Sequence, residues 1–130
     1  MVAGDTLVSG ILLTAGNVND APAGRLLLET LAPRESSVSL LMDRAYSDDV
    51  TRLTAWRLRY NPVVPPKRNR KNPWTHDAEL YKRRNEIERF FRRLKEFRAV
   101  ATRYDKLDVV FTSCIWMACI CILLPCVNTP

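Results

Sequence analysis

One glutamate, Glu88, lies among basic and aromatic residues at helical spacing. Four side chains stand four or seven residues from it: Tyr81, Arg84, Arg92 and Lys95. At about 100° per residue, all five share one stripe of a helix roughly 80° wide. Cations around a carboxylate lower its pKa and keep it ionised, and they can also bind phosphate oxygens. The spacing is also typical of an ordinary salt-bridged helix face, so it leaves both interpretations open.

A second carboxylate, Asp43, directly follows a short apolar run over residues 38–42. Such a run is typical of a strand buried on both faces. Open α/β sheets place ligands at the carboxyl ends of their strands, although an aspartate there is often only a turn or cap residue. A strand-end aspartate with a helical glutamate favours a magnesium site, because magnesium prefers oxygen ligands.

The basic residues are concentrated in one stretch of the chain. Residues 67–103 contain thirteen basic and five acidic residues, so this stretch carries more positive charge than the whole chain, whose net charge is +6. A concentrated basic block is the usual footprint of a protein that binds the phosphate backbone of nucleic acid. Four of its cations lie in a polar loop over residues 65–77: Lys67, Arg68, Arg70 and Lys71.

The first half of the chain alternates between strand and helix patterns. The predicted strands cover residues 6–13, 38–42 and 62–64, and the predicted helices run from Asp20 to about Leu31 and from Ser47 to about Leu58. Asp20 and Ser47 are the expected caps. The expected apolar faces are Leu26, Leu27 and Leu31 in the first helix, and Val50, Leu53 and Trp56 in the second. This order predicts an α/β fold whose strands form a parallel sheet with crossover helices, within a mixed sheet for the fold as a whole.

The second half of the chain is predicted to be helical. A long helix over residues 78–98 carries the Glu88 stripe, with an apolar wall that includes Phe90 and Leu94. A further apolar helix covers residues 108–124, with Asp108 as its expected cap. A chain of 130 residues allows one domain, here expected over residues 1–130.

Composition excludes some classes of protein. The mean hydropathy of −0.16 argues against an integral membrane protein. The uncharged run over residues 109–124 is sixteen residues long, shorter than the roughly 20 needed to span a bilayer. The N-terminus lacks the pattern of a secretory signal. All four cysteines lie in or just after the apolar run, at spacings that do not suggest zinc ligands, so reduced core thiols in a cytoplasmic protein are expected.

Several segments resemble the catalytic domain of insertion-sequence transposases of the Asp-Asp-Glu (DDE) type. The strongest is Tyr81-x2-Arg84-x3-Glu88-x6-Lys95, which fits the Y-(2)-R-(3)-E-(6)-K signature of that family. The segment Met42-Asp43-Arg44-Ala45-Tyr46 is similar to the surroundings of the family's second aspartate. Three further segments are similar: residues 62–67, 89–95 and 102–106.

The resemblance implies an RNase H-like fold and DNA cleavage followed by strand transfer. It implies that Asp43 and Glu88 are catalytic residues that bind Mg²⁺ or Mn²⁺, with two ions in the complete enzyme. It implies that Tyr81, Arg84 and Lys95 position transposon-end DNA. Arg92 and the loop cations would add contacts to the DNA backbone. A homo-oligomer is expected in the active complex, and no membrane partner.

The sequence departs from the family pattern before Asp43. The family's first catalytic aspartate lies on the first strand of the sheet, and the acidic residues available here do not follow a strand in that way: Asp5, Asp20, Glu29 and Glu35. We therefore expect an incomplete RNase H-like fold, a truncated domain that is inactive alone. Two origins stay open: the chain is a degenerate remnant, or it is the downstream frame of an enzyme completed by frameshifting, in which case an upstream reading-frame product supplies the missing aspartate.

Two other functions fit the same composition. A non-catalytic nucleic-acid-binding module would use the same basic block, and its binding would not depend on Asp43 or Glu88. A basic membrane-associated peptide would instead insert the apolar segment 109–124 into lipid. Substitution of the two carboxylates separates the first alternative from a transposase, and liposome flotation tests the second.

Overall fold

A computed structural model describes residues 2–3, 7–31 and 36–124. Asp5, Glu35, Pro125 and Cys126 lie outside the described residues. The chain divides into two compact units: residues 14–84 form the αβ unit, and residues 1–13 with 85–130 form the helical unit. The single domain expected over residues 1–130 stays a prediction.

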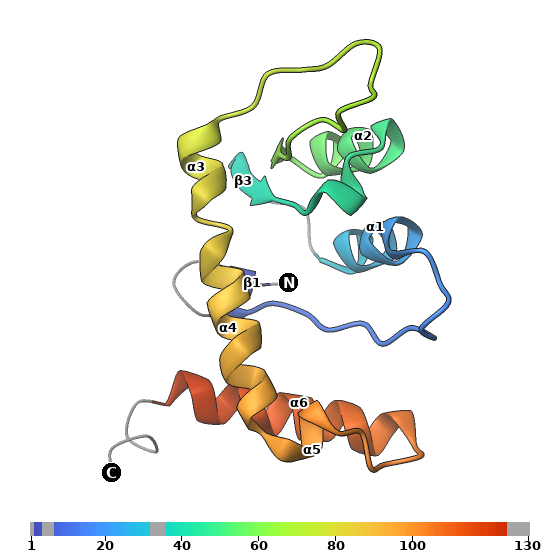
Figure 1. The fold of residues 1–130 in the computed structure, drawn as a ribbon, viewed down its shortest axis with the longest axis vertical. Helices are drawn as coiled ribbons and strands as arrows, with labels where there is room; N and C mark the ends of the chain where they lie inside the picture. The colour runs from blue at the N-terminus through green and yellow to red at the C-terminus, as the bar shows by residue number, and fades with distance from the viewer. Residues whose placement is uncertain (1, 4–6, 32–35, 125–130) are drawn as a thin grey trace. The chain divides into compact units, whose positions relative to one another are not determined.

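The αβ unit is built on a parallel pair of strands. Strand β3 (Val38–Leu41) pairs with β4 (Tyr60–Val63) in parallel, with Val38 opposite Tyr60 and Leu41 opposite Val63. The crossover between them contains the 3-10 helix η1 (Arg44–Tyr46) and helix α2 (Asp49–Arg57). Helix α1 (Asp20–Thr30) packs against α2 and η1 (Figure 1). The predicted strand–helix–strand unit with a mixed α/β architecture is confirmed.

Both predicted helix caps are wrong by one residue. Asn19 caps α1 by accepting a hydrogen bond from the N–H of Ala21 at 3.0 Å, and Asp20 is the first residue of the helix. Asp48 caps α2 by accepting from the N–H of Thr51 at 2.8 Å. Ser47, the predicted cap, is buried at the end of η1, where its own N–H bonds to the carbonyl of Arg44.

The predicted apolar face of the second helix is also wrong. Val50, Leu53 and Trp56 are about half exposed or more, whereas α2 buries Thr51, Thr54 and Ala55. The reason is a polar network between α1 and α2. The Thr51 hydroxyl donates to Asp48 Oδ2 at 2.6 Å and accepts from Arg25 of α1 at 2.9 Å, so the threonine side of α2 faces α1.

Two other burial predictions fail. In the first helix Leu26 is exposed and Leu27 and Leu31 are only partly buried, while Ala21 and Leu28 are buried. Strand β3 is not buried on both faces: Val38 and Ser39 are exposed, and only Leu40 and the following Met42 are buried. Because β3 has a single described strand neighbour, β4, its first residues lie open to solvent.

The strand predicted over residues 6–13 is much shorter in the structure. Strand β2 (Leu7–Val8) pairs antiparallel with β1 (Val2–Ala3), in a sheet separate from β3 and β4. Residues 9–13 continue without strand structure. Ile11 and Leu13 instead pack against the core of the helical unit.

The helical unit packs α4 (Asn85–Glu96) and the short α5 (Arg98–Ala101) against α6 (Asp108–Leu123) (Figure 1). Phe90 and Leu94, one turn apart on α4, face α6. They meet four side chains of that helix: Ile115, Ala118, Cys119 and Ile122. Burial raises the pKa of the Cys119 thiol, so the core keeps it protonated.

The apolar helix α6 begins without the predicted aspartate cap. Leu107 is at the cap position and makes no side-chain cap hydrogen bond, while Asp108 is inside the first turn and pairs with Arg103. Cys114, Cys119 and Cys121 are present as thiols. Within the described ranges, none of the helices has the length and apolar character required to cross a bilayer.

The long helix predicted over residues 78–98 is divided in the structure. Helix α3 (Ala78–Lys82) ends before a turn at Arg83 and Arg84, and α4 begins at Asn85. In that turn the N–H groups of Arg83 and Arg84 bond to the carbonyls three residues earlier, those of Leu80 and Tyr81. This tighter pattern replaces the α-helical one. The single five-residue stripe predicted from spacing therefore holds for Glu88, Arg92 and Lys95 within α4.

Candidate functional site

Asp43 lies at the carboxyl end of the parallel strand pair. The N–H of Met42 still bonds to the carbonyl of Val63 at 3.1 Å, and Asp43 follows as the cap of η1. Its Oδ1 accepts a hydrogen bond from the N–H of Ala45 at 3.1 Å. The side chain is 51% exposed. This carboxylate is therefore held in a defined orientation while solvent still reaches it.

Tyr46 fixes η1, and with it Asp43, against helix α1. Its ring packs on Gly24, where an added Cβ would stand only 2.9 Å from the ring atom Cδ1. Burial first, and then the negative charges of Asp20 and Asp43, raise the pKa of the Tyr46 hydroxyl. The glycine thus allows the close approach that positions the segment 42–46.

The guanidinium of Arg84 binds Asp43 directly. Arg84 Nη1 lies 3.1 Å from Asp43 Oδ2, and the arginine side chain is 25% exposed. The guanidinium carbon also lies 5.8 Å from the centre of the Tyr81 ring. Tyr81 in turn meets the His76 ring edge to face, with 5.8 Å between ring centres. The structure thus brings together three predicted site residues, Asp43, Arg84 and Tyr81.

Glu88, Arg92 and Lys95 lie on α4, in the helical unit. All three side chains are exposed, whereas Phe90 and Leu94 on the same helix are buried. Offsets of four and seven residues place the three on one face. The prediction that Glu88 and Asp43 bind one ion together joins residues of the two units, and it stays a prediction.

The basic loop is anchored through Trp74 to α2 and to Val64, the residue that follows β4. The indole N–H donates to the carbonyl of Val64 at 2.8 Å. The guanidinium groups of Arg52 and Arg70 lie 3.7 Å and 4.5 Å from the centre of the Trp74 ring, so the ring lies against both. Arg70 also forms an ion pair with Asp49 of α2.

These contacts divide the four loop cations into two kinds. Arg70 is 27% exposed and has intramolecular partners. Lys67, Arg68 and Lys71 are exposed. Spacing could not distinguish them, and the residues that anchor the loop, Arg52 and Trp74, were not predicted. A tryptophan within an otherwise polar loop was the one signal in the sequence, because so large an apolar ring tends to find a packing partner.

The donor chemistry near Asp43 suits a hard divalent cation. Magnesium commonly takes one or two carboxylates and completes its shell with water and substrate phosphate, and a half-exposed strand-end carboxylate can supply such a ligand. In the part of the chain that the structure describes, three or more histidine, cysteine, aspartate or glutamate side chains do not gather into a metal-holding group. The roles of Asp43 and Glu88 as metal ligands therefore stay predictions.

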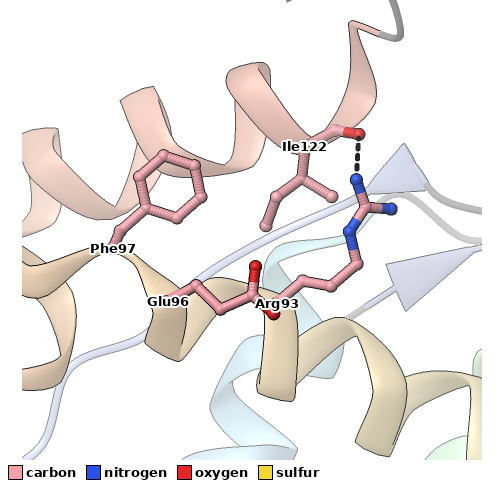
Figure 2. A pocket seen from close by; sticks show the side chains of 4 residues that line it. All are labelled: Arg93, Glu96, Phe97 and Ile122. Atoms are coloured by element: carbon pink, nitrogen blue, oxygen red, sulfur yellow. Dashed lines mark hydrogen bonds between the residues drawn. The ribbon is translucent and has the colours of Figure 1, made fainter. Parts of the chain in front are cut away.

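A pocket of about 220 Å³ lies in the helical unit, lined by Arg93, Glu96, Phe97 and Ile122. Figure 2 shows the Arg93 side chain reaching the carbonyl of Ile122, with 3.4 Å between Nη2 and the oxygen. A cation at the C-terminal turn of α6 stabilises exposed carbonyls there. None of the predicted site residues lines this pocket. Its arginine stabilises the C-terminal end of α6.

Comparison with known proteins adds two findings. A family model described as "Transposase DDE domain" matches residues 1–124. A protein of Brucella ovis named "Putative transposase for insertion sequence element IS6501" is 32% identical over 112 residues, which cover 85% of this chain and 84% of the relative. No solved structure matches the chain significantly.

Proposed function

The chain belongs to the family of transposase DDE domains, and we propose that it is the part of an insertion-sequence transposase that carries two of the catalytic carboxylates. The single observation that supports this most strongly is the meeting of Asp43, Arg84 and Tyr81 at the end of the parallel strand β3. These residues come from two motifs far apart in the sequence. An incomplete RNase H-like fold is part of the proposal.

In this proposal Asp43 and Glu88 hold the divalent cations. When bound, two magnesium or manganese ions would activate the attacking oxygen and stabilise the leaving oxygen of a phosphodiester. Tyr81 and Arg84 hold the DNA strand beside Asp43, and Arg92 and Lys95 hold it beside Glu88. Because cations near the scissile phosphate offset its charge, they favour attack by a nucleophile.

The loop cations bind the DNA backbone at positions distant from the phosphodiester bond that reacts. Lys67, Arg68 and Lys71 are exposed and can neutralise phosphates of any sequence. Arg70 has a different task here from the one expected from sequence. Its contacts with Asp49 and Trp74 hold the loop on the αβ unit, so that its neighbours point to solvent.

We propose further that the third carboxylate comes from outside these 130 residues. Among the described acidic residues that precede Asp43, Asp20 begins α1 and Glu29 near the end of α1 forms an ion pair with Arg57 at 2.9 Å, so neither of these two follows a strand. A two-metal site without its first aspartate lacks a shared ligand. The 130-residue chain alone would therefore bind DNA without cutting it, and an upstream product would complete an active homo-oligomer.

The test is complementation. The chain is combined with an upstream segment that carries a strand-end aspartate, and nicking of transposon-end DNA is followed with Mg²⁺, with Mn²⁺ and with EDTA. Nicking should require both polypeptides and the metal, and it should disappear in Asp43→Ala and in Glu88→Ala. Glu79→Ala, which removes an exposed carboxylate that pairs with Lys82 on α3, is the matched control. Nicking that persists in both variants would remove the catalytic roles of Asp43 and Glu88, and DNA binding without nicking in any combination would instead support a non-catalytic binding module.

A further inference from the structure

We propose that Arg84 is an internal counter-ion that occupies Asp43 until a divalent cation replaces it, and that DNA promotes this exchange by binding Arg84. The inference rests on the proposed function, because it concerns the ion that Asp43 would hold. It assigns to Arg84 a task besides holding DNA: it keeps the metal ligand neutralised when no DNA is bound.

Both oxygens of the Asp43 carboxylate are already engaged. Oδ1 accepts the N–H of Ala45 at 3.1 Å, and Oδ2 lies 3.1 Å from Arg84 Nη1. A divalent cation that binds Oδ2 must displace the guanidinium, because two cations cannot approach one oxygen at bonding distance without strong repulsion. Metal binding and the ion pair therefore compete for one atom.

The position of Arg84 allows the divalent cation to replace it at Asp43. Arg84 lies in the turn between α3 and α4, whereas Asp43 is fixed by the strand end and by its bond to Ala45. When the guanidinium moves to another partner, the hydrogen bond from Ala45 keeps the carboxylate in its orientation. With 51% of Asp43 exposed, water and a hydrated cation have access to the pair.

The competition links metal binding to DNA binding. A DNA phosphate is an alternative partner for the guanidinium, and an arginine forms strong paired hydrogen bonds with it. DNA that binds Arg84 lowers the population of the Arg84–Asp43 ion pair. It therefore raises the affinity of Asp43 for the divalent cation. By thermodynamic linkage, the cation raises the affinity of Arg84 for DNA by the same factor. Asp43 would thus bind the divalent cation mainly when DNA is present.

The test is a Mn²⁺ titration of the ¹⁵N-labelled 130-residue chain, followed by NMR. Mn²⁺ broadens the amide signals of nearby residues, and the Ala45 N–H reports on Asp43 because it bonds to that carboxylate. The readout does not require cleavage. Four proteins are compared without DNA: wild type, Arg84→Gln, Asp43→Asn and, as the matched control, Arg83→Gln, which removes the same charge from the exposed neighbouring residue.

Arg84→Gln should shift the midpoint of Ala45 broadening to at least about threefold lower Mn²⁺ concentration, a change within the range expected for a lost, partly exposed ion pair. Arg83→Gln should leave it near the wild-type value, because a more distant charge is screened by salt. A short DNA duplex should lower the midpoint for the wild type and have a smaller effect on Arg84→Gln.

Two results would overturn the inference, and they are distinguishable. If Asp43→Asn abolishes the broadening but Arg84→Gln leaves the midpoint unchanged or raises it, then Asp43 binds the metal and Arg84 does not compete for it. If Asp43→Asn leaves the broadening unchanged, then the cation is not held by Asp43, and the metal role in the proposed function fails as well. Thermal unfolding of each variant shows whether it is folded, and Arg84→Lys, which keeps the charge, should restore the wild-type midpoint in part.

Discussion

Replacement of Lys67, Arg68 and Lys71 by glutamine should reduce the salt dependence of DNA binding. These three cations are exposed, whereas Arg70 in the same loop is bound to Asp49 and lies against Trp74. Each phosphate contact contributes about 0.9 to the slope of log affinity against log salt concentration on duplex DNA. Loss of three contacts should therefore lower the slope by about 2.7.

The size of the effect makes it easy to measure. Between 50 and 200 mM salt, about 2.7 units of slope correspond to a roughly 40-fold change in affinity. The wild-type chain should thus lose about 40 times more affinity over this interval than the triple variant. Fluorescence anisotropy with a labelled duplex of arbitrary sequence, at four KCl concentrations, gives both slopes.

Arg70→Gln is the matched control, because it removes one charge from the same loop. Its slope should change by less than about 0.5, well below the value for one phosphate contact, while its melting temperature falls because the loop loses its anchor. A triple variant with the wild-type slope would refute the assignment of DNA backbone binding to this loop. If Arg70→Gln lowers the slope of log affinity against log salt concentration by about 0.9, the value for one phosphate contact, then the distinction between the anchoring arginine and the exposed cations is refuted.

Three further predictions concern stability. Leu94→Ala should lower the free energy of unfolding by about 2–5 kcal/mol in urea denaturation, and Phe91→Ala on the exposed side of α4 by much less; equal losses would contradict the described core. Gly24→Ala should cost about 1–3 kcal/mol, because the added Cβ meets the Tyr46 ring, and an unchanged midpoint would contradict that packing. Burial on its own raises the pKa of Asp48, but hydrogen bonds from Thr51 and the charge of Arg25 lower it overall below its ordinary value of 3.8. The stability that Asp48 contributes is thus full above this value and is lost as the pH falls below it; denaturation of wild type and Asp48→Asn across acid pH should show this loss in the wild type alone.

The central strand–helix–strand unit was predictable because each of its parts has a local signal. The apolar run at residues 38–42, the acidic and hydroxyl residues before α2 and the second apolar run at residues 62–64 each specify their own element. The direction that α2 faces was not predictable in the same way. Hydrogen bonds of Thr51 with Asp48 and Arg25 bury the polar side, and the three large apolar side chains of the helix are left exposed.

The residue types of the candidate site were predictable from the sequence, but the contact between Arg84 and Asp43 was not. The signature spacing identified Arg84 and Glu88 as residues of interest, but no local pattern relates Arg84 to Asp43, which lies on another element. The division between α3 and α4 had no signal either. Residues 78–98 contain no glycine or proline, so the turn at Arg83 and Arg84 depends on contacts that a periodic pattern does not contain.

Whether Asp43 and Glu88 bind one divalent ion together is tested most directly by iron-mediated cleavage of the chain. Fe²⁺ bound in place of Mg²⁺, with ascorbate and peroxide, cuts the polypeptide next to the ion. If the two carboxylates share an ion, cuts should appear near residue 43 and near residue 88, Mg²⁺ in excess should suppress both, and Glu88→Gln should remove the cut near residue 43 as well as its own. Cuts near one residue only, or a cut near residue 43 that survives Glu88→Gln undiminished, would contradict a shared metal site.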